Sequence, residues 1–211
     1  LSRSMTAFPL SMDATDVSLA SSGTAFFDTY QFALTHIEWL LGLRKQYFGA
    51  CFPILDRGTF GFYSQVFSLG DFKYARDIDE YKSDPKAVEM AFGMSYARQI
   101  IYQKLSFGIT SSYVESRLAG DDARAFNCAF DIMYRPVQWL NTVIYSRNIG
   151  NDVKYNETTE KQPFQAGLSL HFIPFSRMDS INPDRIDLSL AIGLQKTIDA
   201  PLQFGSTFEL K

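Results

Sequence analysis

Side chains that could do catalytic chemistry are few in this sequence. The two histidines, His36 and His171, have neither the spacing of a metal site nor that of a catalytic pair. The motifs of serine hydrolases, P-loop proteins, zinc proteases and dithiol redox proteins are also missing. Asp77, Asp79 and Glu80 lie in a mixed-charge segment that we expect to be a solvated loop. We therefore expect no enzymatic activity, no metal and no cofactor.

Asp131 is the most informative polar residue. It interrupts the apolar run ARAFNCAFDIMY. It lies an even number of positions after Asn127, so in a strand the two side chains point to the same face. An ionised carboxylate in such a run needs a charged partner, hydrogen bonds or water. We expect Arg98 or Arg147 to supply the partner charge from a nearby strand. The residue is then either a polar anchor in a lumen or half of an ion pair that fixes strand packing.

His36 and Glu38 share one face of an earlier run, and we expect them to belong to a similar network. The predicted lumen network comprises Asp131, Asn127, Arg98, Arg147, His36 and Glu38. The two cysteines, Cys51 and Cys128, both lie inside strand-like runs and are expected to be buried thiols rather than a disulfide.

The elements that carry these residues show a period-two alternation of side chains from about residue 30 to the C-terminus. The alternation divides into about ten runs, mostly about 10 to 14 residues long, separated by turns and polar loops such as 151–162. Strands of globular proteins are usually about five or six residues long, whereas strands tilted across a bilayer need about 9 to 11. The pattern therefore predicts an all-β protein, an antiparallel up-and-down transmembrane β-barrel with about ten visible strands.

The stretch AFGMSYARQIIYQKLSFGITSSYV (91–114) shows which face each residue occupies. Its large side chains are predicted to face lipid: Phe92, Met94, Tyr96, Leu105, Phe107 and Ile109. The residues between them are predicted to face a narrow interior: Gly93, Ser95, Ser106, Gly108 and Thr110. A soluble lipocalin-like barrel would place the apolar face inside instead. Lys and Glu concentrate in the loops rather than on one face of the strands, which favours the membrane interpretation.

Aromatic residues near the ends of the runs fit the interfacial girdles of membrane barrels. They are Trp39, Tyr47, Phe67, Tyr102, Tyr113, Tyr134, Trp139 and Phe175.

Residues 1–29 differ from the rest of the chain, because they are rich in small and hydroxylic residues and alternate only weakly. We expect them to form an N-terminal segment, either a plug in the lumen or a periplasmic leader. Residues 30–211 are then the barrel. The small side chains on the interior face would leave room for residues 10–29.

The overall composition excludes two classes of protein. A net charge of -3 and a pI of about 5.4 give no basic footprint for nucleic acid. A spanning helix is excluded because no run of about eighteen apolar residues occurs. Aromatic residues make up 15% of the chain, and strands are their preferred position.

Several short segments of the sequence, in their order along the chain, resemble those of a known protein family. They are THIEWL (35–40), the paired SYAR and KLSFGI strands, and the hairpin AFDIMYRPVQWL, followed by a strand that closes on NIG. In this order and spacing the chain resembles the PorV/PorQ-type outer-membrane proteins, a branch of the FadL-like β-barrels, over roughly residues 10–175. It differs from them in lacking an Asn-Pro-Ala-Gly segment after the N-terminal part, in showing about ten strands, and in its last residues.

The resemblance implies a barrel of about fourteen strands in the bacterial outer membrane, with an N-terminal segment inside. PorV-type members are non-enzymatic and bind secreted cargo, which implies outer-membrane lipid and proteins of a secretion or surface complex as partners. We therefore expect a binding or scaffold component. A FadL-like transporter of hydrophobic molecules, with a hydrophobic ligand, is the first alternative, and a soluble ligand-binding barrel is the second.

Overall fold

The computed structural model describes residues 13–39, 42–55, 57–68, 87–118, 121–155, 158–172, 188–198 and 200–210. The acidic segment with Asp77, Asp79 and Glu80 lies outside the described residues, as does Phe175. Almost all the regular structure in the described ranges is β-strand, and two short 3-10 helices, η1 (Ala14–Ser18) and η2 (Ser21–Phe26), precede the first strand of the sheet. Neither is long and apolar enough to cross a membrane.

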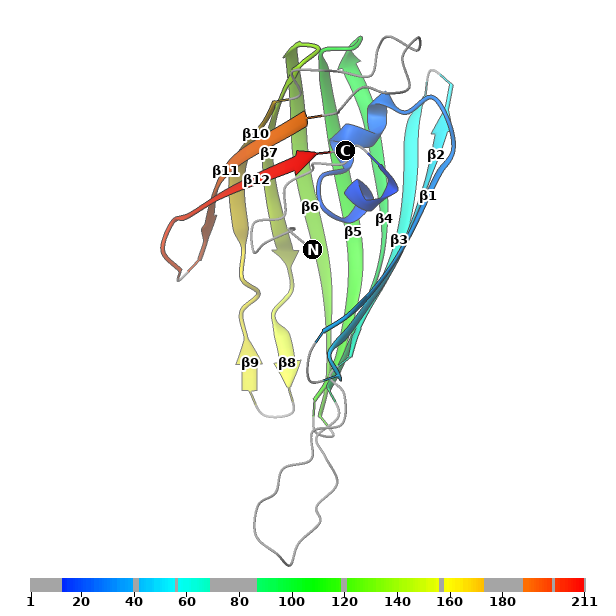
Figure 1. Ribbon diagram of the computed structural model, residues 1–211. Helices are drawn as coiled ribbons and strands as arrows, with labels where there is room; N and C mark the ends of the chain where they lie inside the picture. The colour runs from blue at the N-terminus through cyan, green and yellow to red at the C-terminus, as the bar shows by residue number, and fades with distance from the viewer. Residues whose placement is uncertain are drawn as a thin grey trace, which may run out of the picture.

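Ten antiparallel strands form one sheet in which neighbours in space are neighbours along the chain (Figure 1). The strands are β1 (Gln31–Glu38), β2 (Arg44–Ile54), β3 (Gly58–Ser68), β4 (Ala87–Ile101), β5 (Leu105–Leu118), β6 (Asp121–Val137), β7 (Leu140–Gly150), β10 (Gln165–Phe172), β11 (Leu188–Thr197) and β12 (Gln203–Leu210). The prediction of ten up-and-down strands in an all-β protein is confirmed. Within the described chain β1 and β12 are the two edges and do not pair with each other, so the sheet is not closed.

The segment expected to be a polar loop contains a small separate ribbon, β8 (Val153–Tyr155) paired with β9 (Thr158–Glu160). These strands have three residues each, which is too short for a period-two pattern to reveal them. Hydrogen bonds from two asparagine side chains connect the segments next to the ribbon with the main sheet. Asn151 Oδ1 accepts a hydrogen bond from the Phe126 N–H at 2.8 Å, and Asn148 Nδ2 donates one to the Pro163 carbonyl at 3.0 Å.

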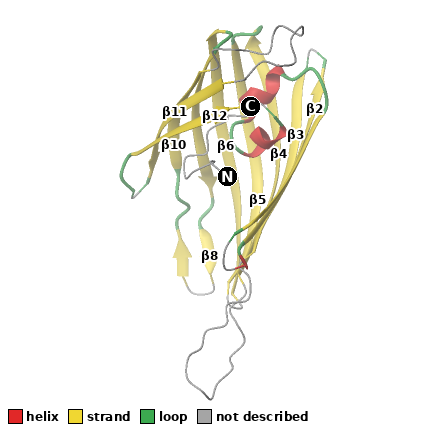
Figure 2. Cartoon of the chain, in the orientation of Figure 1, coloured by secondary structure: helices red, strands yellow, loops and turns green. Residues whose placement is uncertain are grey.

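The main sheet is curved, and the two 3-10 helices lie inside the curve (Figures 1 and 2). We call the face that contacts residues 13–27 the inner face and the opposite one the outer face. η2 contacts β3, β4, β5 and β6, and η1 contacts β1, β2, β3 and β4. The N-terminal segment is therefore the main layer packed on the inner face.

Small residues on the inner face allow this close packing. A Cβ added to Gly108 would lie 2.4 Å from Ser21 Oγ and from the Ser22 nitrogen, so only glycine fits here. Among the described residues, two small apolar clusters lie between segment and sheet. One contains Ala14, Val17, Phe27 and Cys51, and the other contains Ala20, Met133, Val143 and Tyr145.

The outer face carries the large side chains of the 91–114 stretch. Phe92, Met94 and Ile109 are exposed, and Tyr96, Leu105 and Phe107 are half-buried by their neighbours. Neighbouring strands continue the same surface. Its exposed members include Phe126, Phe130, Ile132, Ile144, Leu168, Leu170, Ile192 and Leu194. The residues predicted to face lipid thus share one face of the sheet, opposite the N-terminal segment.

Candidate functional site: the interface between the N-terminal segment and the inner face

Asp131 lies on the inner face of β6, is 4% exposed, and holds the start of η2. Its carboxylate accepts the N–H of Ser22 at 2.6 Å and the N–H of Ser21 at 3.2 Å, with the Ser21 hydroxyl at 3.4 Å. The first N–H groups of a helix have no partner within the helix and need a cap. The residue at the N-cap position is Ala20, which has no side-chain acceptor, so Asp131 supplies the cap from the sheet.

Other inner-face side chains bind the main-chain carbonyls of the segment. Ser106 donates to the Ser22 carbonyl at 2.8 Å, and Gln99 Nε2 donates to the Ala25 carbonyl at 2.9 Å. At the other end of the segment the Tyr47 hydroxyl donates to the Ala14 carbonyl at 3.0 Å.

Thr110 completes this set, because its hydroxyl lies 3.2 Å from Ser21 Oγ and 3.4 Å from the Val17 carbonyl. Five side chains, from β2, β4, β5 and β6, therefore fix the segment mostly through its backbone.

Arg147 is the charged residue that shares this interior with Asp131. It is 9% exposed on the inner face of β7, and its guanidinium lies 4.2 Å from the centre of the Tyr145 ring. Its charge attracts those of Asp131 and Asp16. Arg135 contacts the last residue of η2, with its guanidinium 4.4 Å from the centre of the Phe26 ring. Cations over aromatic faces stabilise such contacts by about 0.5 to 2 kcal/mol.

The remaining members of the predicted network do not join Asp131. Asn127 is on the inner face of β6, but its Oδ1 has no hydrogen-bond partner among the described residues. His36, Glu38 and Arg98 are exposed and lie on the outer face. We correct the expectation for these three residues, because alternate strand residues point to opposite faces. Glu38 instead approaches Arg44 at 3.3 Å on the exposed surface.

The other side chains considered for chemistry are placed separately. His171 is buried on the inner face of β10. Cys51 is buried on the inner face, whereas Cys128 is half-buried on the outer face, and both are free thiols. Among the described residues no three His, Cys, Asp or Glu side chains are grouped so that they could hold a metal ion.

Sequence reasoning missed Tyr47 and Gln99 as contacts of the segment. Tyr47 was expected in an interfacial girdle, but it lies on the inner face and is 6% exposed. The alternation in the sequence already places Tyr47 on the same face of β2 as Gly49 and Cys51, so its inward position could have been predicted. No local signal in the sequence identifies the carbonyl that either side chain binds.

Comparison with known proteins adds no relative. No family model matches this chain, and no curated protein is similar enough to it to count as a relative. The function therefore has to be inferred from the two faces of the sheet and from the segment.

Proposed function

We propose that this chain forms the wall of a bacterial outer-membrane β-barrel of the PorV type, within the FadL-like barrels. In this proposal residues 13–27 lie in the lumen, and the protein acts without catalysis as a binding or scaffold component of a secretion or surface complex. The observation that carries the proposal is the outer face, where a band of large apolar side chains is exposed although the opposite face is covered.

The band has limits that suit a bilayer. On β5 its outer residues run from Leu105 to Tyr113, about nine residues, and strands that cross a bilayer need about 9 to 11. Beyond Tyr113 the outer residues of β5 and β6 become charged: Glu115, Arg117, Asp122 and Arg124. Arg117 forms ion pairs with Glu115 at 2.8 Å and with Asp122 at 3.6 Å, so three of these four charged residues pair with one another. Soluble proteins seldom expose so large an apolar surface without a partner.

The inner face supports a binding or scaffold protein better than a wide pore. The hydrogen bonds from the strands to Ser22, Ala25 and Ala14 hold the segment across several strands. A segment held in this way fills the space that an aqueous channel would need.

The FadL-like alternative is favoured by one observation, a cavity of about 770 Å³ near the exit of the segment, with apolar residues such as Pro53, Ile54 and Ile100 in its lining. The soluble lipocalin-like alternative needs its apolar face inside, and the exposure of Met94 and Ile144, each 60%, argues against it.

A membrane barrel also requires that no sheet edge remains open to lipid, because unpaired backbone groups are costly there. The proposal therefore requires strand partners for β1 and β12 in the membrane. Crosslinking at these two strands would identify the partners.

Fractionation and co-purification test the proposal. We expect the chain to be recovered in outer membranes, to need detergent for extraction, and to migrate differently on gels before and after heating. Co-purification of stable protein partners supports the scaffold, and a bound fatty acid supports the transporter. Recovery in the aqueous phase with no heat-dependent mobility would contradict the membrane proposal as a whole.

A further inference from the structure

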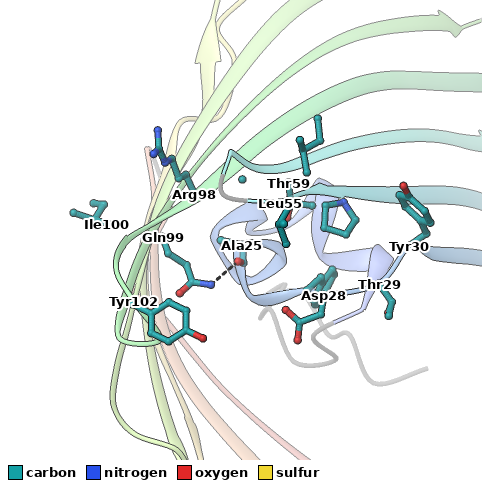
Figure 3. A pocket seen from close by; sticks show the side chains of 14 residues that line it. Ala25, Asp28, Thr29, Tyr30, Leu55, Thr59, Arg98, Gln99, Ile100 and Tyr102 are labelled. Carbon is teal, nitrogen blue, oxygen red and sulfur yellow. Dashed lines mark hydrogen bonds between the residues drawn. The ribbon is translucent and has the colours of Figure 1, made fainter.

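A second cavity, of about 410 Å³, lies between the β4–β5 turn, the β6–β7 turn and the chain that leaves η2. It shares Asp28, Gln99 and Tyr102 with the larger cavity of about 770 Å³. Figure 3 shows these three residues from the larger cavity, with the Gln99 amide bound to the Ala25 carbonyl. The wall that the two cavities share is therefore tied to the N-terminal segment.

Arg135 is a half-buried cation in the lining of the second cavity, and two contacts fix its position. Its Nε donates a hydrogen bond to Asn141 Oδ1 at 3.0 Å, and its guanidinium lies 4.4 Å from the centre of the Phe26 ring. Its two Nη groups have no hydrogen-bond or ion-pair partner among the described residues. These groups form a fork that can bind a carboxylate through two parallel hydrogen bonds.

Lys104 brings a second positive charge to the same place. The Arg135 N–H donates to the Lys104 carbonyl at 2.7 Å, which continues the register of Leu105 with Tyr134. Lys104 and Arg135 therefore lie opposite each other at the ends of β5 and β6, and both line the cavity. Neither forms an ion pair with a carboxylate in the part of the chain that the structure describes. Like charges in such a pair repel each other, so an anion between them would be stabilised.

Asp28 limits the kind of anion that fits. Its carboxylate lines the same cavity, so with Lys104 and Arg135 the described lining carries one more positive than negative charge. This balance suits the single charge of a carboxylate better than the nearly double charge of a phosphate monoester.

The open walls of the cavity favour a peptide over a small molecule. Tyr102, Val137 and Gln138 are exposed in its lining, as is Gln103. Small-molecule sites usually bury most of the surface of their ligand, which side chains exposed in this way do not do. The amides of Gln103 and Gln138 can bind the backbone of a peptide, and acidic motifs are commonly bound by basic side chains.

From this arrangement we infer that the second cavity binds an acidic segment of a partner protein. A glutamate or aspartate carboxylate of that segment accepts hydrogen bonds from the Arg135 guanidinium and from the Lys104 ammonium group. This inference rests on the proposed function as a binding component and adds the chemistry of a partner to it.

Fluorescence anisotropy with the full chain in detergent micelles tests the inference. The probe is a rhodamine-labelled hexapeptide of alternating glutamate and glycine with an amidated C-terminus, and the reference peptide has glutamine in place of glutamate. We expect tighter binding of the glutamate peptide. Lys104→Gln and Arg135→Gln should each weaken its binding about tenfold, because a hydrogen bond to a charged group contributes about that much binding energy. Asp28→Asn should strengthen binding, because it removes a like charge from the cavity.

Arg124→Gln is the matched control, because it removes the same charge from an exposed position at the other end of β6 and should leave binding unchanged. Equal affinity for the two peptides would overturn the inference, and so would equal losses in Arg135→Gln and Arg124→Gln. Displacement of the probe by inorganic phosphate as effective as displacement by unlabelled peptide would also overturn it, because the cavity would then be a site for small anions.

Two further measurements separate the inference from other causes of failure. The Lys104 side chain is exposed and has no hydrogen bond or ion pair in the described part of the chain, so a loss in Lys104→Gln does not come from a loosened segment. An unchanged affinity in Lys104→Gln would therefore contradict the inference even if Arg135→Gln binds weakly. Heat-dependent mobility is measured on the same samples, so a failure of membrane insertion can be distinguished from a failure of peptide binding.

Discussion

Asp131 caps a 3-10 helix that belongs to a distant part of the chain. Residues 21 and 131 are joined by a buried carboxylate that accepts two backbone N–H groups. A buried carboxylate is tolerated when such donors and a nearby cation compensate for its lost hydration. Arg147, one of the two arginines that the sequence left open, contributes an attractive charge, and the N–H groups of the segment supply the donors.

We expect Asp131→Asn to loosen the segment. The amide keeps one acceptor oxygen but turns an NH₂ group toward the N–H of Ser21 or Ser22, and an unsatisfied buried group costs about 1 to 3 kcal/mol. Digestion by protease between residues 13 and 30 should become faster, and the free energy of unfolding should fall by that amount.

Asp122→Asn is the control for this change. It makes the same chemical substitution on the same strand, in an exposed ion pair with Arg117 that is worth at most about 1 kcal/mol. Equal effects of the two substitutions would contradict the capping role of Asp131.

Gly108 makes a second residue-level prediction. In Gly108→Ala the new Cβ would meet the Ser22 backbone at 2.4 Å, so the segment has to move away from β5. We expect a loss of about 1 to 3 kcal/mol in the free energy of unfolding, typical of an overpacked contact, together with faster proteolysis of the segment. Ser111→Ala, on the outer face of the same strand, should change neither quantity measurably.

At the scale of the strand, the alternation of side chains between the two faces predicted most of the fold that could be predicted from the sequence. The ten strands and the faces of the 91–114 stretch follow from period two alone. The same rule places Arg98 with Met94 and Tyr96, and His36 with Leu34, so their outward positions were available in the sequence. Their charge suggested a partner in the interior, but the alternation of side chains along each strand decides the face.

Other parts of the fold could not be predicted from the alternation of side chains. The inner face is covered by residues 13–27, which are far away in the sequence from most of the strands they contact. The carbonyls bound by Gln99 and Tyr47 depend on how η1 and η2 sit on the sheet, and the ribbon β8–β9 is too short to give a pattern.

Phe107→Arg tests the outer face at the strand scale. If Phe107 lies near the bilayer midplane, a charge there should lower the free energy of unfolding from vesicles by about 2 to 4 kcal/mol. Urea titration of the protein in vesicles, followed by fluorescence, measures this difference. Tyr102→Arg is the control, because Tyr102 lies in a turn outside the strands and is 80% exposed. A Phe107→Arg protein that is as stable as the Tyr102→Arg protein would contradict the assignment.

At the scale of the whole molecule, the sheet has an unusual distribution of apolar surface. In the described part of the chain two small clusters of buried apolar residues lie between segment and sheet, whereas many larger side chains are exposed on the outer face. In water this arrangement leaves most of the available hydrophobic stabilisation unused. In a bilayer the outer side chains are solvated by lipid, and the inner contacts need only hold the segment.

The most direct test of this central claim is lipid quenching of a single tryptophan. Trp39 and Trp139 are the only tryptophans, so replacing both by Phe gives a background without tryptophan. Phe107→Trp then places a probe on the outer face, and Phe27→Trp places one on the buried segment. In vesicles of lipids brominated near the middle of the acyl chain, we predict strong quenching at position 107 and little at position 27. Equal quenching at the two positions, or stronger quenching at position 27, would contradict the claim that the outer face meets lipid and the inner face holds the segment.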